Sequence, residues 1–207
     1  MRLLYLHGFR SSPQSSKAKL MALKVQATNR SAASIEWHCP QLPPSPAQAF
    51  ELIWQWAASP EAVLKKVPLG IIGSSLGGYY AAALTERLLR VGMYARCVLL
   101  NPAPYPARDL TAHIGRVENW HADVNGDIGD FKFTEQHVDE LKAIETDAFT
   151  RPERYMAVIA KGDEVLDWRE MTLRYPAGTM RLIEGSDHAI SDFEMYADEV
   201  LAFCQAA

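Results

Sequence analysis

A serine between two glycines follows a short apolar run in the segment GIIGSSLGGYY, residues 70–80. The pattern Gly-x-Ser-x-Gly is centred on Ser75, because centring it on Ser74 would put isoleucine and leucine at the two positions that must be small. In a tight turn from strand to helix, such a serine has an exposed hydroxyl at a helix N-terminus. The pattern therefore favours Ser75 as a nucleophile.

Other uses of a glycine-rich turn fit this segment less well. A dinucleotide-binding turn requires G-x-G-x-x-G, and a Walker loop requires a lysine where Tyr79 stands. A strand-to-helix turn without chemistry stays an alternative when the motif is taken alone. The decision depends on partners elsewhere in the chain.

A nucleophilic serine needs a histidine that accepts its proton and a carboxylate that orients the histidine. Asp163 follows the apolar run 155–160, and His188 follows the run 180–183. The order serine, acid, histidine is that of hydrolases with this type of turn. Because ligand sites of such sheets lie at the carboxyl ends of the strands, the sequence predicts a triad of Ser75, Asp163 and His188.

Asp163 is preferred over two nearby aspartates. Asp167 is expected to cap the helix that follows it, and Asp187 is too close to His188 along the chain to orient it. His7 ends the first apolar run and is expected to shape a loop. His113, His121 and His137 lie in the long insertion and are expected on the surface.

The developing oxyanion needs two N–H donors. The first is expected to be the backbone N–H of Leu76, directly after the serine, and the second that of Phe9, in the loop after the first strand. Three further side chains are expected to contact the substrate: Arg10, Tyr79 and Trp120.

Short apolar runs and helical patterns alternate along the chain and must position these residues. Strands are predicted at 3–6, 35–38, 69–72, 97–100, 155–160 and 180–183, and helices at 15–28, 46–58, 76–91 and 167–175. Residues 193, 196, 200 and 203 form one further apolar helix face. This alternation predicts a single α/β domain over residues 1–207, with a mostly parallel sheet of about six strands flanked by helices.

The segment 103–152 interrupts this alternation. It opens with prolines, contains the glycine- and aspartate-rich stretch DVNGDIGDF, and ends in an amphipathic helix at 135–144, with no convincing buried strand. An insertion of this length is usually functional, and we expect a lid over the site. Its aromatic residues Trp120, Phe131 and Phe133 fit either an acyl pocket or the core of the lid.

No metal site is predicted. Asp123, Asn125 and Asp127 have the spacing of a calcium loop, but isoleucine stands at the sixth position, where glycine is required, and threonine at the twelfth. A surface turn is the favoured interpretation.

Composition limits the remaining classes of function. Of 207 residues, 48% are hydrophobic and 22% charged, and the net charge of −4 indicates neither a nucleic-acid nor a membrane partner. No apolar run is long enough to span a bilayer. Three scattered cysteines fit free thiols in a reducing compartment, so a cytoplasmic protein is expected.

Several strings together resemble a known family. They are YLHGFRSSPQSSKAK, PQLPPSP, GIIGSSLGGYYAAAL, NPA, KGDEVLDW and GSDHAI. The chain is similar, from Leu3 to about Phe203, to the small YqiA/YcfP-like bacterial esterases of the α/β-hydrolase superfamily. The resemblance implies hydrolysis of short acyl esters or thioesters without a cofactor, with Ser75 as nucleophile, Asp163 as acid and His188 as base.

The sequence departs from that family at a few positions. Arg10 stands in place of asparagine, Trp168 in place of tyrosine and Ile190 in place of phenylalanine, and the insertion is longer than usual. These changes preserve the chemistry and leave the acyl-chain preference open. The expected function is that of a carboxylesterase or thioesterase acting on a small molecule. A serine peptidase or amidase, and a non-catalytic binding module, are the alternatives.

Overall fold

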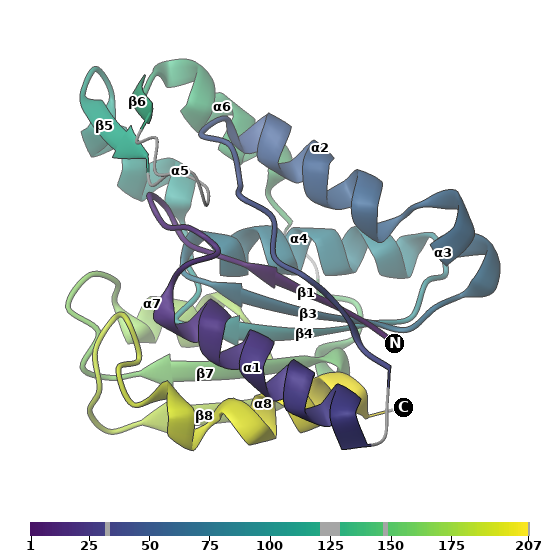
Figure 1. Ribbon diagram of the computed structural model, residues 1–207. Coiled ribbons are helices and arrows are strands. Elements are labelled where there is room, and N and C mark those ends of the chain that lie inside the picture. Colours follow the sequence, from purple (N-terminus) through teal and green to yellow (C-terminus); the bar gives the residue numbers. More distant parts are fainter. Residues whose placement is uncertain (32–33, 121–128, 147–148, 207) are drawn as a thin grey trace.

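A six-stranded sheet forms the centre of the computed structural model, which describes residues 1–31, 34–120, 129–146 and 149–206 (Figure 1). The strands are all parallel, in the order β2-β1-β3-β4-β7-β8. Their bounds are β1 (Arg2–Leu6), β2 (Glu36–His38), β3 (Leu69–Ser74), β4 (Ala95–Leu100), β7 (Tyr155–Ala160) and β8 (Thr179–Ile183). All six predicted strands are confirmed, with bounds that shift by at most two residues.

The apolar runs reflect strands that are covered on both faces. Every residue of β1, β3 and β7 is buried, and the alternation that marks a half-exposed strand is therefore absent. The edge strand β8 differs, since four of its five residues are exposed.

Helices cover both faces of the sheet (Figure 1). One face packs against α1 (Ser16–Ser31) and α8 (Ala197–Gln205), and the other against α2 (Pro46–Ala57), α4 (Leu76–Arg90) and α7 (Trp168–Arg174). A short helix, α3 (Pro60–Lys65), precedes β3. The predicted C-terminal helix is divided, because a 3₁₀ turn, η3 (Phe193–Met195), precedes α8. Of the described helices, none combines the length and the apolar character that crossing a membrane requires.

The insertion between β4 and β7 has its own secondary structure. It contains α5 (Pro106–Asp109), η1 (Leu110–His113), β5 (Val117–Trp120), β6 (Gly129–Lys132), α6 (Glu135–Ile144) and η2 (Pro152–Arg154). The helix predicted at 135–144 is confirmed. The antiparallel pair β5–β6 was not predicted, because its strands are short and only half covered: in β5 the burial alternates, and β6 has no buried residue.

The strand order places the site. β1 lies between β2 and β3. The chain passes from β1 to β2 on one side and then returns to β3 on the other side, so the strand order reverses direction at β1. Open α/β sheets bind ligands outside the carboxyl ends of the strands at such a switch point. The turn containing Ser75 follows β3, and the loop with Phe9 follows β1 at this point.

Candidate active site

Ser75 occupies a strained turn between β3 and α4. Its φ of 54° and ψ of −122° lie in a region that non-glycine residues rarely adopt. Both flanking glycines are required by close backbone contacts: a Cβ at Gly73 would lie 2.3 Å from the carbonyl oxygen of Gly77, and one at Gly77 would lie 2.1 Å from that of Leu6. The small residues of the sequence motif therefore allow β1, β3 and α4 to approach closely and lift the Ser75 hydroxyl out of the turn.

Three side chains from distant parts of the chain meet at this turn. The Oγ of Ser75 lies 3.1 Å from Nε2 of His188, and Nδ1 of His188 lies 2.7 Å from Oδ2 of Asp163. Because a carboxylate only accepts, Nδ1 carries the ring proton and Nε2 is left to accept the serine proton. This is the arrangement that a proton-accepting histidine needs.

The carboxylate of Asp163 is held in place by the backbone that follows it. Its side chain is fully buried, and Oδ1 accepts hydrogen bonds from the N–H groups of Val165 and Leu166, both at 2.8 Å. The neighbouring aspartates have other partners. Asp167 accepts from the N–H of Arg169 and caps α7, and Asp187 accepts from Ser191.

Leu76 is the first residue of α4 and directly follows Ser75, so its N–H has no partner within the helix. The loop after β1 turns tightly, with Arg10 at a φ of 55° and a hydrogen bond from the N–H of Ser11 to the carbonyl of Gly8. Phe9 lies in this turn and lines the same cavity as Ser75. The two expected oxyanion donors thus come from adjacent elements at the switch point.

His7 fixes the loop that follows β1. It is buried, and its Nε2 accepts a hydrogen bond of 3.1 Å from the N–H of Leu42, so Nδ1 carries the proton and donates to the Gly8 carbonyl. Burial lowers the pKa of His7 to about 4. His7 is therefore neutral at physiological pH and shapes the loop, as the sequence suggested.

An aromatic cluster packs against Phe9. Its ring meets those of Trp120, Phe131, Phe133 and His113 edge-on, at centroid distances of 5.4–6.2 Å. The indole N–H of Trp120 also donates to the carbonyl of Leu42, the residue whose N–H binds His7. The insertion therefore packs directly on the loop that carries the second expected oxyanion donor.

An ionic contact joins the same two segments. The buried carboxylate of Glu118, in β5, accepts from His113 at 2.6 Å and pairs with Arg10 at 2.9 Å. The hydrogen bond from His113 lowers the pKa of Glu118. Sequence reasoning missed Glu118 and placed His113 on the surface, because the two lie in a segment without recognisable periodicity.

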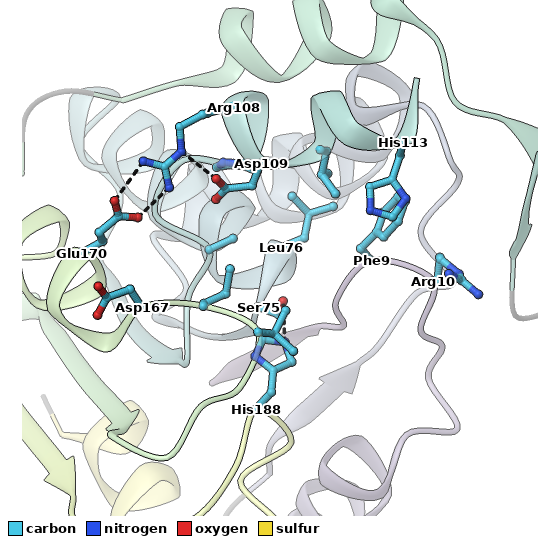
Figure 2. A pocket seen from close by; sticks show the side chains of 15 residues that line it. Phe9, Arg10, Ser75, Leu76, Arg108, Asp109, His113, Asp167, Glu170 and His188 are labelled. Carbon is cyan, nitrogen blue, oxygen red and sulfur yellow. Dashed lines mark hydrogen bonds and ion pairs between the residues drawn. The ribbon is translucent and has the colours of Figure 1, made fainter. Parts of the chain in front are cut away.

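A cavity of about 820 Å³ opens above Ser75 (Figure 2). Its lining includes the apolar side chains of Leu76, Pro106 and Leu110. The side chains of Arg108, Asp109 and Glu170 lie together at one end (Figure 2). Much of this lining comes from the insertion, which forms one wall of the site.

Two of the expected substrate contacts lie elsewhere. Arg10 lines the cavity, whereas Tyr79 is buried and its hydroxyl donates to the carbonyl of Leu141 in α6. Trp120 is also buried, under Phe9 and Phe131, and is absent from the described lining of the cavity. Both residues lie in the packing between the insertion and the core and not in the described lining of the cavity.

The described residues contain no group of three or more His, Cys, Asp and Glu side chains placed to hold a metal ion. Asp123, Asn125 and Asp127 lie outside the described residues.

Known structures share this architecture. A putative hydrolase from Agrobacterium vitis S4 is similar with a TM-score of 0.68 at 17% identity, covering 99% of this chain and 88% of that one. Est1E from Butyrivibrio proteoclasticus has a TM-score of 0.67 at 14% identity, covering 98% and 86% of the two chains. Mouse alpha/beta hydrolase domain-containing protein 10 has a TM-score of 0.62 at 11% identity, covering 97% and 89%. These similarities show the α/β-hydrolase fold.

The sequence itself identifies the family. Residues 2–205 match the uncharacterised protein family UPF0227, which confirms the resemblance to YqiA-like proteins. With the fold and the family in agreement over nearly the whole chain, this protein belongs to the UPF0227 family.

Proposed function

We propose that this protein is a serine hydrolase that cleaves short to medium acyl esters or thioesters through an acyl-enzyme on Ser75. The observation that carries the proposal is the continuous hydrogen-bonded path from the Ser75 hydroxyl through His188 to Asp163, with distances of 3.1 and 2.7 Å. The path begins at a strained turn over a cavity that can hold a small acyl substrate.

The proposed reaction has two stages. Ser75 attacks the acyl carbonyl while His188 takes the hydroxyl proton, and Asp163 stabilises the imidazolium. The N–H groups of Leu76 and Phe9 stabilise the oxyanion. His188 then gives its proton to the leaving alcohol or thiol. In the second stage His188 deprotonates a water molecule that attacks the acyl-enzyme, and it returns this proton to the Oγ of Ser75 as the carboxylic acid leaves.

A ligand seen in a protein with the same fold supports the proposal of an acyl substrate. One solved structure has ferulic acid bound to Est1E, a protein similar to this chain over most of its length. The proposed reaction uses side chains, backbone N–H groups and water, and no cofactor takes part in it. We further propose that it takes place in the cytoplasm, where the three free cysteines would stay reduced.

Labelling with a fluorophosphonate probe tests the mechanism. The wild type and Ser74→Ala, which changes the adjacent serine, are expected to be labelled, and Ser75→Ala is not. Equal labelling of Ser75→Ala and the wild type would overturn the proposal. A protein that is never labelled would be a binding module on a hydrolase scaffold.

A series of p-nitrophenyl esters of increasing acyl length, with matched thioesters and anilides, tests the substrate class. Hydrolysis of esters or thioesters at rates well above those of the anilides is expected. Comparable rates on the anilides would indicate an amidase or peptidase with the same triad.

A further inference from the structure

Asn101 lies at the end of β4, in the centre of the fold, and is fully buried. Its amide nitrogen donates to the carbonyl oxygens of Asp187 and His188, at 3.0 and 3.2 Å. Its amide oxygen accepts a 2.8 Å hydrogen bond from the N–H of Ala160, the last residue of β7. One side chain thus joins the loop that carries the candidate base to the strand that leads to the candidate acid, Asp163.

The backbone of His188 is held on both sides. Its N–H donates to the carboxylate of Glu164 at 3.0 Å, and its carbonyl accepts from Asn101. The ammonium group of Lys17 donates to the carbonyl of the next residue, Ala189. Of these three side chains only Asn101 is fully buried, and it also contacts a second strand.

The end of β4 also holds the candidate nucleophile. The N–H of Ser75 donates to the carbonyl of Leu100, and the N–H of Ala103 donates to the carbonyl of Ser75, both at 3.0 Å. Segment 100–103 therefore contacts the backbone of Ser75 on one side and that of His188 on the other. A displacement of this segment would change the distance between their reacting atoms.

We propose that Asn101 is a positioning residue that sets the place of the His188 ring relative to Ser75 and Asp163. This inference rests on the proposed function. Asn101 does not line the described cavity and so acts through His188, not on the substrate.

The chemistry of the site explains why asparagine stands there. Two carbonyls need donors and one N–H needs an acceptor, which a single carboxamide supplies, while aspartate has no donor and leucine has neither group. The backbone of Asn101 has a φ of 40°, in the left-handed region that asparagine tolerates better than most residues. Both requirements, the amide and the backbone conformation, are met by asparagine.

Two substitutions separate positioning from folding. Asn101→Asp keeps the acceptor for Ala160 but turns an oxygen toward two carbonyls, and Asn101→Gly keeps the left-handed backbone but removes the amide. Asn29→Asp is the matched control, because Asn29, in α1, makes the same type of contact with both backbone groups of Ile35, just before β2. Neither residue lines the described cavity. For each folded variant, kcat and KM on a p-nitrophenyl ester are measured per active site, counted by fluorophosphonate titration.

For Asn101→Asp we expect kcat per active site to fall on the order of 10²-fold, and for Asn101→Gly at least about tenfold, with KM within about twofold. The downfield proton resonance of the His188 Nδ1–H in both variants should shift or broaden. Asn29→Asp should keep kcat and the resonance.

A kcat per active site within twofold of the wild type in both folded Asn101 variants, with an unchanged resonance, would overturn the inference. A loss of total activity that is explained only by fewer fluorophosphonate-reactive sites would overturn it as well. The resonance depends on the His188–Asp163 contact and not on turnover, so it tests Asn101 even if the wild type hydrolyses no ester.

Discussion

The guanidinium of Arg108 donates two hydrogen bonds to the carboxylate of Glu170, at 2.9 and 2.6 Å, and so joins α5 of the insertion to α7 beside the cavity (Figure 2). A third bond, to Asp109, completes the group. The Arg108 side chain is 56% exposed and that of Glu170 is 34% exposed, and pairs of this kind contribute little to stability. We therefore expect these three charged side chains to affect the shape and charge of the cavity more than the stability of the fold.

Glu170→Gln removes one negative charge from this end of the cavity. We compare kcat/KM for two p-nitrophenyl esters, one with a carboxylate in its acyl chain and one neutral. The ratio of the charged to the neutral ester should rise about fivefold in the variant. The reason is that two unit charges about 8 Å apart, at an effective dielectric constant of about 40, interact by about 1 kcal/mol. Glu153→Gln is the control, since Glu153 also pairs with an arginine but lies at the amino end of β7, whereas Glu170 lies in α7, which follows the carboxyl end of that strand. An unchanged ratio in Glu170→Gln would show that this wall does not face the acyl chain.

Asp163→Asn tests the role of the buried carboxylate. The amide cannot stabilise a positively charged His188, and kcat should fall on the order of 10³–10⁴-fold with a small change in KM. Asp167→Asn tests the rival acid, and asparagine can still cap α7. Steady-state kinetics of the two variants should differ by at least about 10²-fold in kcat. Similar losses in both would contradict the assignment of Asp163.

His7 should make the protein sensitive to acid. Burial lowers its pKa from 6.5 to about 4, so the unfolded chain binds a proton between these values while the folded protein does not. Its contribution to stability is therefore present above pH 6.5 and is lost as the pH falls toward 4. The difference in pKa corresponds to about 3 kcal/mol.

The measurement is urea unfolding of the wild type and His7→Gln from pH 7 to pH 4. The variant lacks the titrating ring, so its free energy of unfolding should fall less steeply over this range. Parallel curves for the two proteins would mean that His7 is not held neutral in the fold.

Gly77→Ala tests the close approach of α4 to β1. The added Cβ would lie 2.1 Å from the carbonyl oxygen of Leu6, a backbone atom that cannot turn away. We expect a loss of about 3 kcal/mol or more in the free energy of unfolding, and loss of fluorophosphonate labelling where the variant still folds. For Gly129→Ala, where no described atom lies within 4 Å of the new Cβ, the change should stay within about 0.5 kcal/mol.

Local patterns in the sequence were sufficient to predict the sheet and the three candidate triad residues. Buried parallel strands need continuous apolar runs, and a tight turn needs small residues around Ser75. The position just after a predicted strand distinguished Asp163 and His188 from neighbouring acids and histidines. Each of these requirements acts within a few residues, so it leaves a trace in the sequence.

The surroundings of these residues were decided only by the tertiary structure. Arg108 and Glu170 lie 62 positions apart, and Asn101 lies 87 positions from His188. Contacts over such distances follow no spacing rule, because they depend on how the strands are ordered and how the insertion packs. Trp120 shows the same limit: its side chain is suited to a substrate pocket, but packing on Phe9 buries it away from the cavity. The sequence by itself determined which groups could do chemistry, and the packing of distant segments decided what holds them in place.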